Sequence, residues 1–119
     1  MNEKLTEQEL HNLAMNIVGE DLEKQGFEFL AVNSKLKQNP QFVVQKGKQM
    51  SFVVVKAICH PQKVADMDKT LVQKVKNHGE KFDATTYYAA VGLGHGKDFE
   101  KPVLKDEDYA QLYPGLKLV

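Results

Sequence analysis

Residues 39–58 read NPQFVVQKGKQMSFVVVKAI and contain two apolar runs separated by a short polar connection. The first run, residues 42–45, and the second, residues 51–58, are rich in valine and phenylalanine, which favour β-strands. Residues 46–49 join the two runs and include Gly47, a residue type that hairpin connections favour. We therefore predict two neighbouring antiparallel strands in this stretch.

A helix followed by a strand is predicted before this hairpin. Thr6 and Glu9 have the spacing of a capping box, in which each side chain accepts a hydrogen bond from the other residue's backbone N–H. Gly26 is placed to end the helix in a left-handed conformation, so we expect the helix over residues 7–25. Its apolar residues recur with a period near 3.6 and are Leu10, Leu13, Ala14, Ile17 and Leu22. Residues 27–32 read as a strand because they form a short apolar run with two aromatics.

A second helix and a fourth strand are predicted after the hairpin. Pro61 ends the third strand, because proline cannot donate a hydrogen bond to a ladder. Asp66 or Asp68 then caps a helix. The apolar positions of this helix are Met67, Leu71, Val75 and Phe82. Residues 85–91 read as a strand buried on both faces, and the glycine-rich residues 92–96 are expected to end it in a turn that exposes its histidine.

The predicted order of the main elements is helix, strand, strand, strand, helix, strand. We expect an α/β fold with three layers, in which a central mixed β-sheet has a helix on each side. A short helical turn over residues 106–112 and an edge-like strand over residues 116–119 complete the chain. The length of 119 residues fits a single domain spanning residues 1–119.

The composition indicates a protein of the cytoplasm. Cys59 is the single cysteine, which excludes an intrachain disulfide and fits a reducing compartment. Residues 1–4 do not resemble the start of a signal peptide. No apolar run approaches the roughly 20 residues of a membrane-spanning helix. We therefore expect no membrane partner and a cytoplasmic location.

The basic residues are all lysines and are unevenly distributed. Residues 1–30 hold seven acids and two lysines, whereas residues 31–81 hold ten lysines and three acids, a balance of +7. Such a segment either binds nucleic-acid phosphates weakly or forms an ordinary solvated lysine surface. The candidate phosphate contacts are Lys56, Lys69, Lys74 and Lys76. The absence of arginine argues against sequence-specific reading of DNA.

The hairpin and the element order resemble the restriction-endonuclease-like superfamily, the nucleases of the PD-(D/E)xK motif, over about residues 5–92. In that family an acid follows a proline at the start of the second strand, and an acid-x-lysine triplet lies in the third. Here Gln41 follows Pro40, and Val54 and Lys56 occupy the triplet, so only the lysine matches. The resemblance implies a vestigial catalytic site formed by Gln41, Val54 and Lys56.

The two replaced acids argue against nuclease chemistry. Mg²⁺ requires hard oxygen ligands and usually one or two carboxylates, which neither a glutamine nor a valine supplies. Without a metal, nothing at the site would polarise a phosphodiester or activate water. We expect no catalytic residues, no metal and no cofactor. The leading interpretation is a non-catalytic binding or structural module whose partner is either a nucleic-acid backbone or a protein.

Two other functions remain open. The first is a metal-dependent nuclease whose acids have moved to other positions, for which Glu9, Glu20, Asp66 and Asp68 are the candidates. The second is a homo-oligomeric, complex-forming subunit, for example a homodimer paired through the edge strand of residues 116–119. Lys56 itself has two interpretations: its stem covers the core, or its ammonium contacts a phosphate or another ligand.

The remaining chemical candidates are weak. Cys59 and His60 are adjacent and would point to opposite faces of a strand, so they cannot form a nucleophile and base pair. The four histidines lack the spacing of a zinc site. Tyr87 and Tyr88 also alternate, which predicts one core tyrosine and one partly exposed tyrosine.

Overall fold

The computed structural model describes residues 3–36 and 38–119. The chain forms α1 (Glu7–Lys24), β1 (Glu28–Val32), β2 (Phe42–Lys46), β3 (Gln49–Ile58), α2 (Lys69–Glu80), β4 (Thr85–His95), β5 (Tyr109–Leu112) and β6 (Lys117–Leu118). The fold is α/β, and the first six elements have the predicted order α-β-β-β-α-β. Within these residues, neither helix has the length and apolar character needed to cross a membrane.

The strands form one mixed sheet with the order β1-β2-β3-β4-β5. Strands β1, β2 and β3 are antiparallel neighbours, as the hairpin pattern predicts, whereas β3 and β4 are parallel. Parallel neighbours need a crossover connection, and α2 supplies it. Both β5 and β6 pair antiparallel with the far edge of β4, β5 near its C-terminal end and β6 near its N-terminal end.

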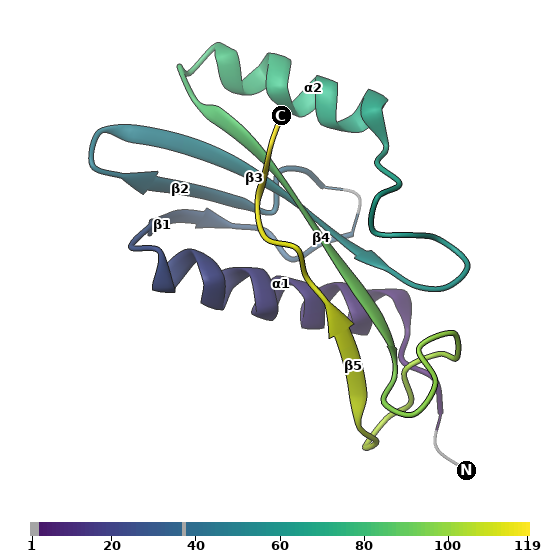
Figure 1. Cartoon of the computed structure of the whole chain (residues 1–119). Coiled ribbons are helices and arrows are strands. Elements are labelled where there is room, and N and C mark those ends of the chain that lie inside the picture. The colour runs from purple at the N-terminus through teal and green to yellow at the C-terminus, as the bar shows by residue number, and fades with distance from the viewer. Residues whose placement is uncertain (1–2, 37) are drawn as a thin grey trace.

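The two helices cover opposite faces of this sheet, which confirms the three-layer arrangement (Figure 1). One core joins α1 to alternate residues of the strands, including Phe42, Val53 and Val55. The other core joins α2 to the intervening residues, including Phe52 and Val54. The alternation follows from the period of two in a β-strand.

The ends of both helices agree with the predicted caps. The capping box of Thr6 and Glu9 is present, and Gly26 follows α1 with a φ of +87°. Asp68 is the residue that caps α2, and its Oδ1 accepts a hydrogen bond from the N–H of Leu71. The expectations for Met67 and Phe82 are wrong, because α2 spans Lys69–Glu80: Met67 precedes the cap, although it packs against the α2 core, and Phe82 follows the helix and is 55% exposed.

The expectation that residues 92–96 end the fourth strand is also wrong. Strand β4 continues to His95, which is half-buried and hydrogen-bonds Glu107. A Cβ atom on Gly94 would overlap the backbone of Phe99, and one on Gly92 would lie 2.8 Å from the Val64 side chain. These glycines therefore allow other segments to approach the strand closely, rather than forming a turn.

The C-terminal elements differ from the prediction in one place. Residues 109–112 form β5 instead of a helical turn, because they hydrogen-bond the exposed edge of β4. Such pairing between distant segments overrides a weak local preference. The predicted final strand is present as β6, and Val119 extends the contact by donating a hydrogen bond to the carbonyl of Thr86.

Candidate functional site

Gln41 lies immediately before β2 and is 2% exposed. The first paired residues of β2 and β3 are Phe42 and Val53. Val55 lies two residues further along β3, so no residue of β2 is paired with it. The Oε1 atom of Gln41 accepts a hydrogen bond of 2.7 Å from the N–H of Val55. The side chain therefore extends the ladder past the end of the strand.

The other half of the Gln41 amide is occupied as well. Its Nε2 atom donates to the carbonyl of Gln38 at 3.0 Å and to Oδ1 of Asn39 at 2.7 Å. An amide can donate and accept at once, but an ionised carboxylate only accepts. A carboxylate at this position would place its oxygen against two other oxygens. The hydrogen bonds at this position therefore fit a glutamine and not an ionised acid.

Val54 is fully buried at 0% exposure and belongs to the core beneath α2. It lies beside Tyr88 of β4 in the parallel register. A side chain at this position contacts packed apolar groups and does not reach solvent. Of the three residues of the expected vestigial site, the structure therefore brings Gln41 and Lys56 to one pocket and leaves Val54 in the core.

Lys56 is half-buried near the end of β3 and lies between two pockets. The first, called the His11 pocket, measures about 300 Å³ and is lined by Glu7, Leu10, His11, Leu36, Gln41, Val55, Lys56, Ala57, Cys59 and Gln62. The second, called the Asp66 pocket, measures about 460 Å³ and is lined by Lys56, Ala57, Ile58, Gln62, Asp66, Met67, Asp68 and Tyr88. Across residues 3–36 and 38–119, no carboxylate lies within 4 Å of the Lys56 ammonium.

His11 is the residue of this region that the sequence reasoning missed. It is 4% exposed, and burial followed by the positive charge of Lys56 lowers the pKa of its imidazole below the ordinary value. The signal was present in the helix pattern. His11 precedes Ala14, Met15 and Val18 on the buried stripe of α1. A single buried histidine shows no metal-ligand spacing, so the spacing of the four histidines does not point to His11.

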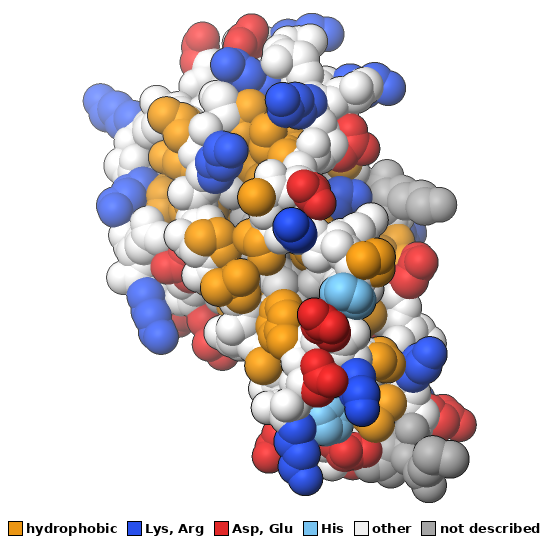
Figure 2. Space-filling view, turned by 45° about the vertical axis from the view of Figure 1, so that its right-hand side comes forward, with side chains coloured by type: hydrophobic (Ala, Val, Ile, Leu, Met, Phe, Trp, Pro, Cys, Tyr) orange, Lys and Arg blue, Asp and Glu red, His pale blue; other side chains and the backbone are white. Residues whose placement is uncertain are grey.

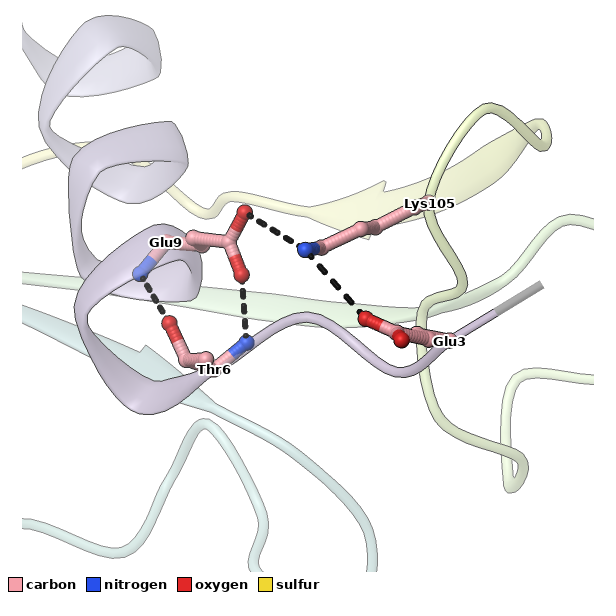
Figure 3. A network of polar contacts seen from close by, with 4 residues as sticks. All are labelled: Glu3, Thr6, Glu9 and Lys105. Carbon is pink, nitrogen blue, oxygen red and sulfur yellow. Dashed lines mark hydrogen bonds and ion pairs between the residues drawn. The ribbon is translucent and has the colours of Figure 1, made fainter.

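The candidate migrated acids lie in three different places. Glu9 accepts the capping hydrogen bond of Thr6, which lowers its pKa, and it lies 3.8 Å from Lys105 (Figure 3). Glu20 lines a separate groove between α1 and β5. Only Asp66 and Asp68 line a pocket together with Lys56. In the described part of the chain, no three histidine, cysteine or acidic side chains form a metal-binding group.

The candidate lysines of α2 do not form one row. Lys69 and Lys76 are seven residues apart, close to two helical turns, and therefore share a flank of α2. Lys74 is five residues from Lys69 and points to a different side. Figure 2 shows lysine side chains around an apolar strip in the upper half of the molecule, where α2 lies.

The remaining candidates have structural roles. Cys59 is half-buried against the α1 core, and burial raises the pKa of its thiol, so it is not an activated nucleophile. His60 is exposed. Tyr88 is buried under α2, whereas Tyr87 is half-buried against the α1 core, which confirms that the two rings lie on opposite faces.

A protein-family model described as Domain of unknown function (DUF8840) matches residues 8–119, which is nearly the whole chain. The chain belongs to the DUF8840 family. The match covers all six strands and both helices, apart from Glu7, the first residue of α1. It also covers every residue that lines the two pockets beside Lys56, again apart from Glu7. No curated protein matches this DUF8840 chain.

Proposed function

We propose that this DUF8840 chain is a non-catalytic binding module on an endonuclease-like framework, with the nucleic-acid backbone as its partner. The main observation behind the proposal is the hydrogen bonding of Gln41, at the position where the resemblance expects a metal-binding acid. The oxygen and the nitrogen of its amide both form hydrogen bonds within the protein. The burial of Val54 at the second acid position supports the same conclusion. The element order and the parallel pairing of β3 with β4 support the framework.

The partner is proposed from the distribution of charge. Residues 31–81 carry a balance of +7, and many of their lysines lie on α2 and on the β2–β3 hairpin. A hydrogen bond of 3.0 Å from Gln49 Nε2 to the carbonyl of Asp83 holds the hairpin beside the end of α2. Lysines on both elements can therefore contact one phosphate backbone. Binding should be weak and independent of sequence, because phosphate contacts carry no base information.

The test is fluorescence anisotropy with labelled DNA and RNA of unrelated sequences. Affinity should fall steeply between about 50 mM and about 200 mM salt. The double substitution Lys69→Glu with Lys76→Glu should weaken binding equally for all sequences. A matched control is Lys97→Glu with Lys101→Glu, which reverses the same charge in an exposed loop outside this surface. Absence of binding at low salt, or equal losses in both double variants, would contradict the proposal.

The absence of cleavage is tested separately. Purified protein with Mg²⁺ or Mn²⁺ should leave DNA and RNA intact, since Gln41 and Val54 supply no carboxylate. Cleavage that persists through repurification and disappears in Lys56→Ala would overturn the non-catalytic assignment.

One observation favours the alternative of migrated acids. Asp66 and Asp68 line the same pocket as Lys56, and two carboxylates can bind Mg²⁺ together with water. Each already has one oxygen engaged, since Asp66 accepts from the N–H of Lys63 and Asp68 caps α2. Calorimetric titration with Mn²⁺ tests this alternative. Saturable binding that is lost in Asp66→Asn would favour it.

Another observation favours self-association, but through a different edge from the one expected. Every residue of β1 is exposed, and Phe29, Leu30 and Val32 are 40%, 48% and 59% exposed. Among the described residues, β1 pairs only with β2, so its outer edge is available for pairing with another chain. Strand β6 is likewise paired on one side, with β4, but it has only two residues and therefore offers fewer backbone groups for pairing than the five residues of β1.

A further inference from the structure

The His11 pocket contains a buried polar atom that the fold leaves unpaired. Within the residues that the structure describes, His11 Nε2 is buried and has no hydrogen-bond partner. Such an atom has lost its hydrogen bonds to water without replacement, which is uncommon in folded proteins. Because His11 lines the pocket, an occupant can supply the missing partner.

The other polar groups of the pocket define the charge of that occupant. Lys56 lines the same wall and has no carboxylate partner in the described residues. The donors of Gln41 are engaged within the protein. The Glu7 carboxylate is exposed, whereas His11 is buried and Lys56 half-buried. The inner groups that can bind an occupant are therefore a cation and an imidazole, and both can donate to an oxyanion.

The rest of the lining is apolar except for Gln62, which is exposed, and Cys59. Leu10, Leu36, Val55 and Ala57 contribute hydrocarbon surface to the wall. The volume of about 300 Å³ lies at the small end of the range for ligand pockets. We propose that the His11 pocket binds a small organic carboxylate, with Lys56 and His11 donating to the oxyanion and the apolar wall contacting the hydrocarbon part. This inference is independent of nucleic-acid binding, since it requires no lysine of α2.

The test follows the His11 imidazole signals by NMR during titration with acetate, butyrate and hexanoate at constant pH and ionic strength. The signals should shift and saturate, and affinity should rise about fourfold for each methylene that becomes buried. Inorganic phosphate is the comparison anion, because it has the charge but no hydrocarbon part. Tighter binding of phosphate than of butyrate would overturn the proposal.

Substitutions identify the binding groups. Lys56→Met should weaken butyrate binding by about tenfold or more, which corresponds to the loss of a charge-assisted hydrogen bond. Lys56→Arg should retain binding, and it also serves as the test if Lys56→Met does not fold. The matched control is Lys117→Met, which removes an exposed lysine outside this pocket. His11 shifts that do not saturate, equal butyrate affinity in the Lys56→Met and Lys117→Met variants, or loss of binding in Lys56→Arg would each overturn the proposal.

Discussion

The side chain of Gln41 hydrogen-bonds the backbone of Val55 at 2.7 Å, at the point where the pairing of β2 with β3 ends and β3 continues paired with β4. The same amide donates to Gln38 and Asn39 in the preceding loop. One side chain thus joins the loop before β2 to the end of β3. These contacts also form part of the wall beside Lys56, so the local fold and the candidate site depend on the same residue.

Gln41→Glu should destabilise the fold by about 3 kcal/mol at neutral pH, because the carboxylate oxygen in place of Nε2 would face the oxygens of Gln38 and Asn39 with no proton to donate. Burial raises the pKa of the introduced carboxyl in the folded state above its unfolded value. The loss should therefore be smallest below about pH 4 and should grow as the pH rises. Urea unfolding at several pH values measures this.

The control for that substitution is Gln62→Glu, which changes an exposed glutamine of the same pocket. It should alter the free energy of unfolding by no more than about 0.5 kcal/mol. An equal loss in both variants would mean that the hydrogen bonds of Gln41 do not stabilise the fold.

His11 should make the fold less stable in mild acid. Burial and Lys56 lower the pKa of His11 in the folded state, so the unfolded chain binds its proton more readily. The contribution of neutral His11 to the free energy of unfolding is complete above the pKa of histidine in the unfolded chain, about 6.5. It is lost as the pH falls towards the lower pKa that His11 has in the folded protein. In His11→Leu, the decline in the free energy of unfolding between about pH 7.5 and about pH 5.5, one unit on either side of the pKa in the unfolded chain, should be smaller than in the wild type.

The control for His11 is His60→Leu, which removes an exposed histidine. This variant should retain the pH dependence of the wild type. If the free energy of unfolding of His11→Leu depends on pH as it does in the wild type and in His60→Leu, other groups cause the acid sensitivity.

Gly94→Ala and Gly19→Ala should change stability in opposite directions. A Cβ atom on Gly94 would overlap the backbone of Phe99, which cannot move without distorting the chain that crosses β4, so a loss of about 3 kcal/mol or more is expected. On Gly19, within α1, the Cβ atom would meet only Phe42 at an ordinary 3.5 Å. There, alanine should gain up to about 1 kcal/mol through its higher helix propensity.

Thermal unfolding measures the two glycine variants side by side. Equal effects would indicate that the segment around Phe99 does not pack on β4 as described. A stabilised Gly94→Ala variant would exclude the close approach entirely.

Removal of residues 116–119 should destabilise the monomer rather than only dissociate an oligomer. The deletion removes the pairing of β6 with β4, the hydrogen bond from Val119 to Thr86 and the contact of Leu116 with the α1 core. Urea unfolding of the truncated chain should therefore show a lower midpoint. An unchanged midpoint would mean that β6 contributes nothing to the folded monomer.

Self-association is better tested at β1. If light scattering at high micromolar concentration shows a dimer, Leu30→Lys should dissociate it while the monomer stays folded, because the Leu30 side chain is already 48% exposed. Leu112→Lys, at the opposite edge of the sheet and 55% exposed, is the matched control. A monomeric wild type, or a dimer that survives Leu30→Lys, would exclude pairing through β1.

The sequence predicted elements whose signals are local. The capping box of Thr6 and Glu9 and the left-handed Gly26 lie within a few residues of the helix ends that they define. The hairpin was predicted because its two apolar runs, residues 42–45 and 51–58, are separated by only five residues. The expectation for residues 106–112 was wrong because their partner is β4, which lies earlier in the chain and cannot be recognised from a short window.

By itself, the amino-acid sequence determined the order α-β-β-β-α-β, the two faces of each buried strand and the presence of Gln41 and Val54 at positions where the resemblance expects acids, since each depends on residue type and short-range periodicity. Only the tertiary structure decided why these residues occupy the site. The donors and acceptors around Gln41, the closed core around Val54 and the unpaired Nε2 atom of His11 arise from segments far apart in sequence. Hydrogen bonding and burial depend on which atoms meet in space, and sequence periodicity contains no such information.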